Sequence, residues 1–256
     1  MKDTPKKSAI IIAIGDELLS GRIEDHNTNF LIQRLNDQGI VINYCLIIPD
    51  DISIIAETIF SYHNKATWLF VSGGLGPTHD DVTMEGIAKA FEEPLVCNTL
   101  LSNIIKQRFG EKCTESHLKM AYVPEGTELI SARKQNLPVI QYKNIFVFPG
   151  VPELLQHLFL SVIDKFQGSK TWSKELLFDV DEGTIAERLK EILKRFSGLK
   201  IGSYPVVVNN RSLVKIVLQH GDQDRLIEAE KYAVSSLGRN IIEQPGIKNP
   251  SIPGTS

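Results

Sequence analysis

The sequence predicts an α/β fold, in which a doubly wound, mostly parallel sheet forms a first domain and a smaller α+β domain follows it. Three observations support this prediction. In the first half of the chain, short apolar runs alternate with amphipathic helical patterns, as βαβ units require. These runs are apolar at almost every position, which is typical of strands covered on both faces. A polar stretch near residue 170 precedes a second, shorter series of strands and helices.

The composition narrows the class of protein. The 256 residues are enough for one large domain or two smaller ones. The net charge is −3, from 28 lysines and arginines against 31 acidic residues, and no concentrated basic surface suggests a nucleic-acid partner. The three cysteines are far apart and form no C-x-x-C pair, which favours a reducing, cytoplasmic location. No run approaches the ~18 apolar residues of a membrane span, so no membrane association is expected.

Three strand-helix units are predicted before residue 92. The first strand, at residues 9–14, follows a lysine-rich start, but its six apolar residues are too few for a signal peptide. Further strands are expected at residues 40–48 and 68–72, and a helix at 84–91 follows the third strand. Amphipathic helices separate the strands, and their apolar positions are Phe30, Leu31, Leu35, Ile52, Ile55, Ile59 and Phe60.

The remaining residues complete the first domain and form the second. Up to residue 168 we expect helices broken near Gly110, a turn at 124–127, antiparallel strands at 137–141 and 144–148, and a helix starting near Pro152. The first domain is therefore predicted at residues 1–168. A polar linker at 167–174 leads to a β-α-β-β-α domain within residues 169–240, with strands at 175–180, 199–208 and 212–219 and helices near 185–193 and 226–237. Residues 241–256 are expected to be a flexible tail.

The most informative stretch is the loop after the third strand, where Gly73, Gly74 and Gly76 precede a helix. Glycines let a ligand approach the bare backbone. A glycine-rich loop at a helix start also presents free N–H groups and a positive dipole end, which suits phosphate. The same loop carries Asp80 and Asp81, which would repel a bare phosphate. A metal ion or a proton-transfer role would explain both acids, whereas a capping box over residues 78–81 would explain only one.

Acidic pairs also follow the first two strands. Right-handed crossovers place the three strand ends at one edge of the sheet, where ligands bind in open α/β sheets. We therefore expect the acids of all three strand ends to lie close together above the glycine loop. These acids are Asp16, Glu17, Asp50, Asp51, Asp80 and Asp81. Pro149 and Gly150 follow another strand and could form a second wall. Asn27 and Thr28 are explained most simply as helix caps, with a ligand contact as the alternative.

Several of these motifs together resemble the MoaB/Mog-type molybdopterin-binding fold. Within that superfamily the chain resembles the CinA-like branch more closely, and most closely the molybdopterin-binding-like domain of eukaryotic-type FAD synthase. The resemblance covers about residues 8–240 and extends to residues 202–205 in the second domain. It rests on residues 15–19 (GDELL), 27–29 (NTN), 49–50 (PD), 73–83 (GGLGPTHDDVT) and 148–153 (FPGVPE).

The resemblance implies chemistry at a phosphoanhydride next to adenosine. Mog-type proteins pass AMP to molybdopterin, and the two acids important in them match Asp50 and Asp81. CinA-like relatives hydrolyse ADP-ribose to AMP and ribose 5-phosphate with a divalent metal. The domain in FAD synthase is linked to splitting FAD into FMN and AMP. We assign neither FAD synthesis nor the amidohydrolase activity of many CinA proteins, because the segments for them are not expected in this sequence.

The leading hypothesis is a metal-dependent nucleotide pyrophosphatase that releases AMP from ADP-ribose or FAD. Catalysis is assigned to Asp50, Asp81 and Asp16, and Asp80 and Asp81 are the expected ligands of Mg²⁺, Mn²⁺ or Co²⁺. The expected substrate contacts are Gly73, Gly74, Gly76, Thr78, Asn27, Glu17, Pro149 and Gly150. Two alternatives stay open: a molybdopterin-binding or adenylyl-transfer protein of molybdenum cofactor biosynthesis, and a scaffold that binds a nucleotide without turnover. By analogy with the superfamily we expect a homo-oligomer.

Overall fold

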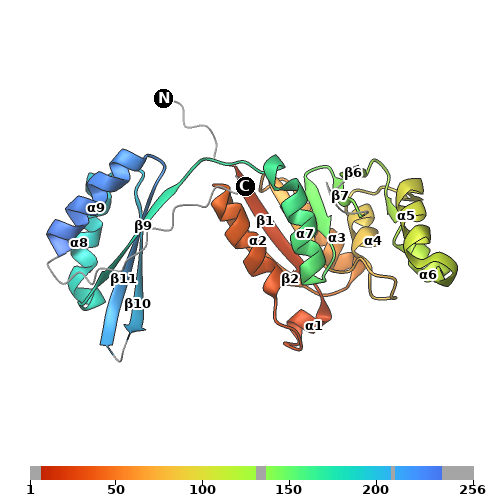
Figure 1. Ribbon diagram of the computed structural model, residues 1–256, viewed down its shortest axis with the longest axis horizontal. Helices are drawn as coiled ribbons and strands as arrows, with labels where there is room; N and C mark the ends of the chain where they lie inside the picture. Colours follow the sequence, from red (N-terminus) through yellow and green to blue (C-terminus); the bar gives the residue numbers. More distant parts are fainter. Residues whose placement is uncertain (1–6, 131–136, 209–210, 238–256) are drawn as a thin grey trace, which may run out of the picture. The chain divides into compact units, whose positions relative to one another are not determined.

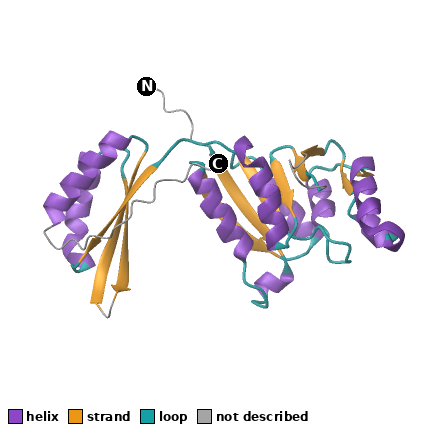
Figure 2. Ribbon diagram, viewed as in Figure 1, coloured by secondary structure: helices purple, strands orange, loops and turns teal. Residues whose placement is uncertain are grey.

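The computed structural model describes residues 7–130, 137–208 and 211–237, and the chain divides into two compact units, residues 1–168 and 169–256. The first unit contains a six-stranded sheet with helices on both faces (Figures 1 and 2). Its strands lie in the order β2 (Val41–Ile48), β1 (Ser8–Ile14), β3 (Trp68–Ser72), β8 (Ile145–Phe148), β7 (Val139–Tyr142) and β6 (Glu128–Ile130). The first four are parallel, and β7 and β6 are antiparallel to their neighbours. The predicted doubly wound, mostly parallel sheet is confirmed.

Alternate side chains of the central strands fill two separate cores. In β1, Ala9 and Ile11 pack with α2 (His26–Asp37) and α7 (Pro152–Val162), which lie side by side in front of the sheet in Figure 1. On the opposite face, Ile10 and Ile12 pack with α3 (Ile52–Tyr62), α4 (Thr83–Ala90) and α5 (Thr99–Phe109). Because both faces are buried, the strands are apolar throughout, and their carboxyl ends open at one edge.

The first unit also contains short strands and helices that the sequence patterns do not predict. Strands β4 (Leu95–Cys97) and β5 (Tyr122–Pro124) form an antiparallel ribbon, and α5, η1 (Gly110–Lys112) and α6 (Glu115–Lys119) lie between them in sequence. A one-turn helix, α1 (Asp16–Leu19), follows β1, and η2 (Ile163–Lys165) follows α7. The strands β4, β5 and β6 were not predicted, since three residues are too few to show a period.

The helix starts differ from the expected caps. Asp25 caps α2 by accepting a hydrogen bond from the amide of Thr28, so the interpretation of Asn27 and Thr28 as caps is wrong. Asp51 caps α3 through the amides of residues 53 and 54. The capping box over residues 78–81 is also wrong, because α4 begins at Thr83 and its N-cap makes no side-chain hydrogen bond. Among the acids at the strand ends, Asp51 therefore has a structural role as the N-cap of α3.

The second unit has its own antiparallel sheet and core. The strands β10 (Lys200–Val208), β11 (Arg211–His220) and β9 (Trp172–Phe178) lie in that order, with α8 (Glu182–Arg195) and α9 (Gln223–Leu237) packed on them. Strand β9 begins at Trp172, three residues before the predicted start, so Lys174 belongs to the strand and not to the linker. The predicted tail, 241–256, lies outside the described residues. None of the described helices is long and apolar enough to cross a membrane.

Candidate functional site

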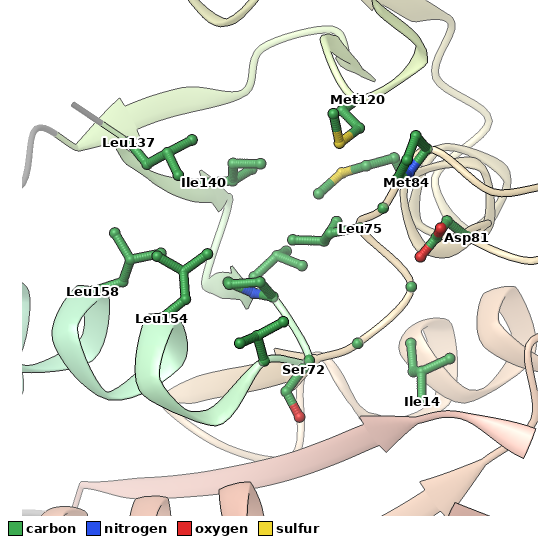
Figure 3. A pocket seen from close by; sticks show the side chains of 18 of the residues that line it. Ile14, Ser72, Leu75, Asp81, Met84, Met120, Leu137, Ile140, Leu154 and Leu158 are labelled. Atoms are coloured by element: carbon green, nitrogen blue, oxygen red, sulfur yellow. The ribbon is translucent and has the colours of Figure 1, made fainter. Parts of the chain in front are cut away.

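A cavity of about 720 Å³ lies in the first unit, where β1, β3 and β8 end. Ile14, Ser72 and Pro149 contribute to its wall from these three strand ends. Figure 3 shows the apolar part of the wall, in which Leu154 and Leu158 of α7 lie across the cavity from Met84 and Met120. The cavity is large enough for a small-molecule ligand, and most of its lining is apolar.

The glycine loop forms one side of the cavity, and its geometry requires glycine. Gly73 has a φ of 103°, and a Cβ there would lie 2.1 Å from the carbonyl oxygen of Ile14. Gly74 has a φ of 61°, and a Cβ there would lie 2.3 Å from Oγ1 of Thr83. Thr83 is fully buried; its hydroxyl donates to the Gly73 carbonyl at 2.9 Å and its amide to the Gly74 carbonyl at 3.2 Å. The first residue of α4 therefore fixes the loop.

Asn27 joins a second wall to this loop. The residue is 8% exposed, and its Nδ2 donates a hydrogen bond to the carbonyl of Gly150 at 2.7 Å. A Cβ on Gly150 would lie 3.5 Å from the Cα of Gly73, so the loops after β3 and β8 are in close contact. The Oδ1 atom of Asn27 is buried and has no hydrogen-bond partner among the described residues. Asn27 therefore fixes the loop after β8 against the glycine loop.

Asp81 lines the cavity from the end of the glycine loop. Its Oδ2 accepts hydrogen bonds from the amide of Thr78, at 2.9 Å, and from the Thr78 hydroxyl. The ammonium of Lys119, at the end of α6, donates to the Asp81 carbonyl at 2.8 Å and to the Thr78 carbonyl at 3.4 Å. The same ammonium forms an ion pair with Glu85 at 3.2 Å. The segment that carries Asp81 is therefore held from both α4 and α6.

Asp50 belongs to a neighbouring acidic group. Its Oδ2 accepts a hydrogen bond from the amide of Asp16 at 2.9 Å. Burial raises the pKa of Asp50 above its ordinary value, the hydrogen bond from Asp16 opposes this, and the charges of Glu17, Asp16 and Asp80 add to the increase. Asp80 is 60% exposed, and the side chain of Thr78 is the main cause that lowers its pKa. Carboxylates from three strand ends therefore affect one another.

Only some of the site residues predicted from the sequence line the cavity. The cavity is lined by Glu17, Asn27, Gly73, Gly74, Gly76, Asp81, Pro149 and Gly150. Four other candidates are outside that lining: Asp16, Asp50, Thr78 and Asp80. Thr78 instead holds the carboxylate of Asp81, and Asp16 and Asp50 contact each other. Across the ranges that the structure describes, no three His, Cys, Asp or Glu side chains form a group that could hold a metal.

Sequence reasoning missed several residues of the wall. Lys119 and Arg108 line the cavity from the segment between β4 and β5, and Glu85 from the first turn of α4. No local motif marks either cation, because the nearest residue of the predicted site is more than twenty positions away in the sequence. Glu85 follows Thr83 by two positions, and an acid in the first turn of a helix beside the glycine loop was a usable signal.

The fold and the cavity define an α/β protein whose candidate ligand site lies at the carboxyl ends of parallel strands. The chain belongs to the family described as "Probable molybdopterin binding domain", whose model matches residues 10–167. A second family model, "FAD synthase, middle domain", matches residues 170–245. These matches confirm the predicted membership of the molybdopterin-binding superfamily and the likeness to the FAD synthase branch.

Individual relatives agree with this assignment. A protein of Archaeoglobus fulgidus is 33% identical over 77% of this chain and 85% of its own length. A "Probable FAD synthase" of Caenorhabditis briggsae is 28% identical over 91% of this chain, which spans about half (50%) of that relative. The crystal structure of the protein CinA from Thermoplasma acidophilum is 28% identical, with a TM-score of 0.58 over 63% of this chain and 99% of that one. The likeness to the CinA-like branch is thereby confirmed.

Proposed function

We propose that the protein is a divalent-metal-dependent nucleotide pyrophosphatase that hydrolyses ADP-ribose or FAD and releases AMP. The observation that supports this most strongly is that the glycine loop and the Asp81 carboxylate form one cavity wall, where a Cβ on Gly76 would lie 2.5 Å from Oδ2 of Asp81. The loop offers backbone N–H groups at a helix start to a phosphate, and the acid lies within the same wall. A diphosphate bound there would contact the N–H groups of the loop, which bind anions. It would also lie near the carboxylate of Asp81, which could accept a proton or bind a cation.

One acid, Asp50, is suited to proton transfer. A carboxylate with a raised pKa is closer to the pKa of an effective general base than an ordinary carboxylate, and burial and neighbouring acids raise the pKa of Asp50. Asp16 contacts Asp50 directly, and Glu17 extends from the same helix into the cavity wall. In this proposal Asp50 accepts the proton of the attacking water, and Asp16 and Glu17 orient Asp50 and the water.

Asp80 and Asp81 suit a divalent cation that is bound partly by the protein and partly by the phosphates of the substrate. Mg²⁺ is usually bound through one or two carboxylates together with substrate phosphates, and it needs no cage of three acids. Asp80 and Asp81 would hold such an ion. When bound, the ion would withdraw charge from the phosphoanhydride and acidify a water molecule. Binding the substrate would then complete the metal site.

The relatives favour chemistry on an adenine nucleotide. The second family model and the Caenorhabditis protein carry the name of FAD synthase, an enzyme named for an adenine dinucleotide. We transfer from these relatives the class of molecule, a nucleotide that contains adenosine. The hydrolytic direction is our inference from the acids at the cavity. The homo-oligomer expected from the superfamily stays a prediction.

The function can be tested by incubating the purified chain with FAD, ADP-ribose, NAD or ATP, each with Mg²⁺, Mn²⁺, Co²⁺ or EDTA. Separation of the products by chromatography should show AMP together with FMN or ribose 5-phosphate, only when a divalent ion is present. Release of AMP from NAD or ATP alone would assign a different substrate. A folded protein that releases no AMP from either FAD or ADP-ribose contradicts the proposal.

The apolar wall favours one second candidate. Met84, Met120, Leu154 and Leu158 could cover the flat ring of a pterin, which agrees with the description of the matching family. In that case the protein would bind molybdopterin or transfer an adenylyl group to it. Denaturing the purified protein and recording the fluorescence of released ligands separates the two candidates. A stoichiometric pterin, with no AMP released from FAD or ADP-ribose, supports the second.

A further inference from the structure

Lys119 is the cavity residue whose contacts the proposed reaction does not yet use. It lies at the end of α6, about forty positions after the glycine loop, and its side chain is 33% exposed. The ammonium has three acceptors: the carbonyl of Asp81 at 2.8 Å, the carbonyl of Thr78 at 3.4 Å and the carboxylate of Glu85 at 3.2 Å. The first two contacts are hydrogen bonds to backbone oxygens, and the third is an ion pair.

These contacts lie on the turn that presents Asp81. On one side of the turn, the Asp81 carboxylate accepts the amide and the hydroxyl of Thr78. Across the backbone, the amide of Asp81 donates to the Thr78 carbonyl at 3.4 Å, a weak bond. Lys119 reinforces this weak side, because it binds the Thr78 carbonyl and the Asp81 carbonyl together. Glu85 holds the ammonium in place from the first turn of α4.

We propose that Lys119 is a positioning residue that fixes the turn from Thr78 to Asp81 and so holds the Asp81 carboxylate toward the ligand. Both hydrogen bonds of the ammonium go to the backbone of this turn, so its effect on the reaction is exerted through Asp81. Its effect on turnover rests on the proposed function. Its effect on the turn does not, and this difference allows the two to be tested separately.

The experiment compares Lys119→Met, Lys119→Arg and Asp81→Asn, the double variant Lys119→Met/Asp81→Asn, and a matched control. The control is Lys112→Met, which removes an exposed ammonium from η1, outside the cavity lining. Two measurements are made on each protein. Hydrogen exchange followed by mass spectrometry reports the amides of residues 78–81 without ligand, and the peptide over β9 serves as an internal reference. Steady-state release of AMP gives kcat and KM.

Lys119→Met should accelerate exchange at residues 78–81 at least about tenfold, while β9 is unchanged, because the turn loses both carbonyl contacts. It should lower kcat by about tenfold to a hundredfold, with KM within about threefold, as expected when a catalytic group is misplaced. In the Asp81→Asn background the same change should lower the remaining activity by less than about twofold. Lys119→Arg should retain part of the wild-type kcat, and Lys112→Met all of it.

Three results would overturn the proposal. The first is unchanged exchange at residues 78–81 in Lys119→Met. The second is an effect on KM alone, which would make Lys119 a substrate contact. The third is an equal loss of kcat with and without Asp81. If the wild type releases no AMP, the proposed function fails and the exchange experiment alone decides the role of Lys119. Should Lys119→Met not fold, Glu85→Gln, which loosens the ammonium, should show a smaller acceleration in the same peptide.

Discussion

The amide of Asp16 donates a hydrogen bond to the carboxylate of Asp50, and this 2.9 Å contact joins the segments that follow β1 and β2. It brings together two acids that are 34 residues apart. Asp50 carries a raised pKa as a result of burial and of nearby negative charge. Such concentrations of charge are more frequent at functional sites than elsewhere in a protein. The contact therefore marks the acidic side of the proposed site.

Asp50 should make folding stability depend on pH. Because its pKa is raised in the folded protein, the native state binds this proton more tightly than the unfolded chain. The favourable contribution of Asp50 is present below its ordinary pKa of 3.8 and is lost as pH rises through the folded value. At about pH 8, Asp50→Asn should thus raise the free energy of unfolding slightly, by up to about 0.5 kcal/mol for a partly exposed group.

The measurement is urea denaturation in EDTA at about pH 8 and again near pH 4, where the difference between Asp50→Asn and wild type should shrink. The asparagine can still accept the Asp16 amide, so the geometry is retained. Asp164→Asn, which removes an exposed carboxylate from η2, is the matched control. A variant less stable than wild type at the higher pH would contradict the account of this carboxylate.

Asp81→Asn should remove activity and leave the fold intact. The amide oxygen of asparagine can accept the Thr78 amide as Oδ2 does now, so the turn should persist. The negative charge at the cavity wall is lost, and release of AMP should fall at least about a hundredfold. Circular dichroism and thermal melting should match the wild type. Unchanged turnover would exclude Asp81 from the mechanism, whereas a large fall in melting temperature would show that its role is structural.

Gly73→Ala should destabilise the protein strongly. The backbone at Gly73 has a φ of 103°, and the added methyl would lie 2.1 Å from the carbonyl oxygen of Ile14. Strain and clash together should cost at least about 3 kcal/mol of unfolding free energy. Gly126→Ala is the control, because Gly126 has a similar positive φ of 82° but open space around it. It should cost only about 1 kcal/mol, and equal losses in the two variants would refute the close approach at Gly73.

Asn27→Ala should weaken the junction between the loops after β3 and β8. The substitution leaves the Gly150 carbonyl without its buried donor, at a cost of about 1–3 kcal/mol. Nucleotide binding should also weaken, because Asn27 lines the cavity and holds the Gly150 loop that forms part of its wall. Asn29→Ala, at an exposed position of the same helix, should change neither quantity. Calorimetry with AMP and thermal melting test both effects, and the prediction fails if the two variants behave alike.

Much of the first unit could be predicted because its information is local. The runs at residues 9–14 and 68–71 are apolar at every position, which predicts strands of a parallel sheet covered on both faces. The topological rule then placed Asp16, Asp50 and Asp81 near one edge. The rule locates strand ends and not side chains, which is why it did not distinguish Asp81, in the cavity wall, from Asp50, beside it.

The rest depended on contacts that no short segment contains. Asp25 and Asn27 are both suitable caps, and only the tertiary structure shows that Asp25 caps the helix while Asn27 turns inward to Gly150. Lys119 reaches the glycine loop from a segment whose short strands gave no periodic signal. Contacts between residues that are far apart in the sequence cannot be predicted from local patterns in a single sequence.

The most direct test of the central claim is the release of AMP from FAD or ADP-ribose by the purified wild-type chain, measured with and without a divalent cation. The account predicts stoichiometric AMP and FMN, or AMP and ribose 5-phosphate, with Mg²⁺, Mn²⁺ or Co²⁺, and loss of this activity in EDTA and in Asp81→Asn. A correctly folded protein that leaves both FAD and ADP-ribose intact with every cation would contradict it.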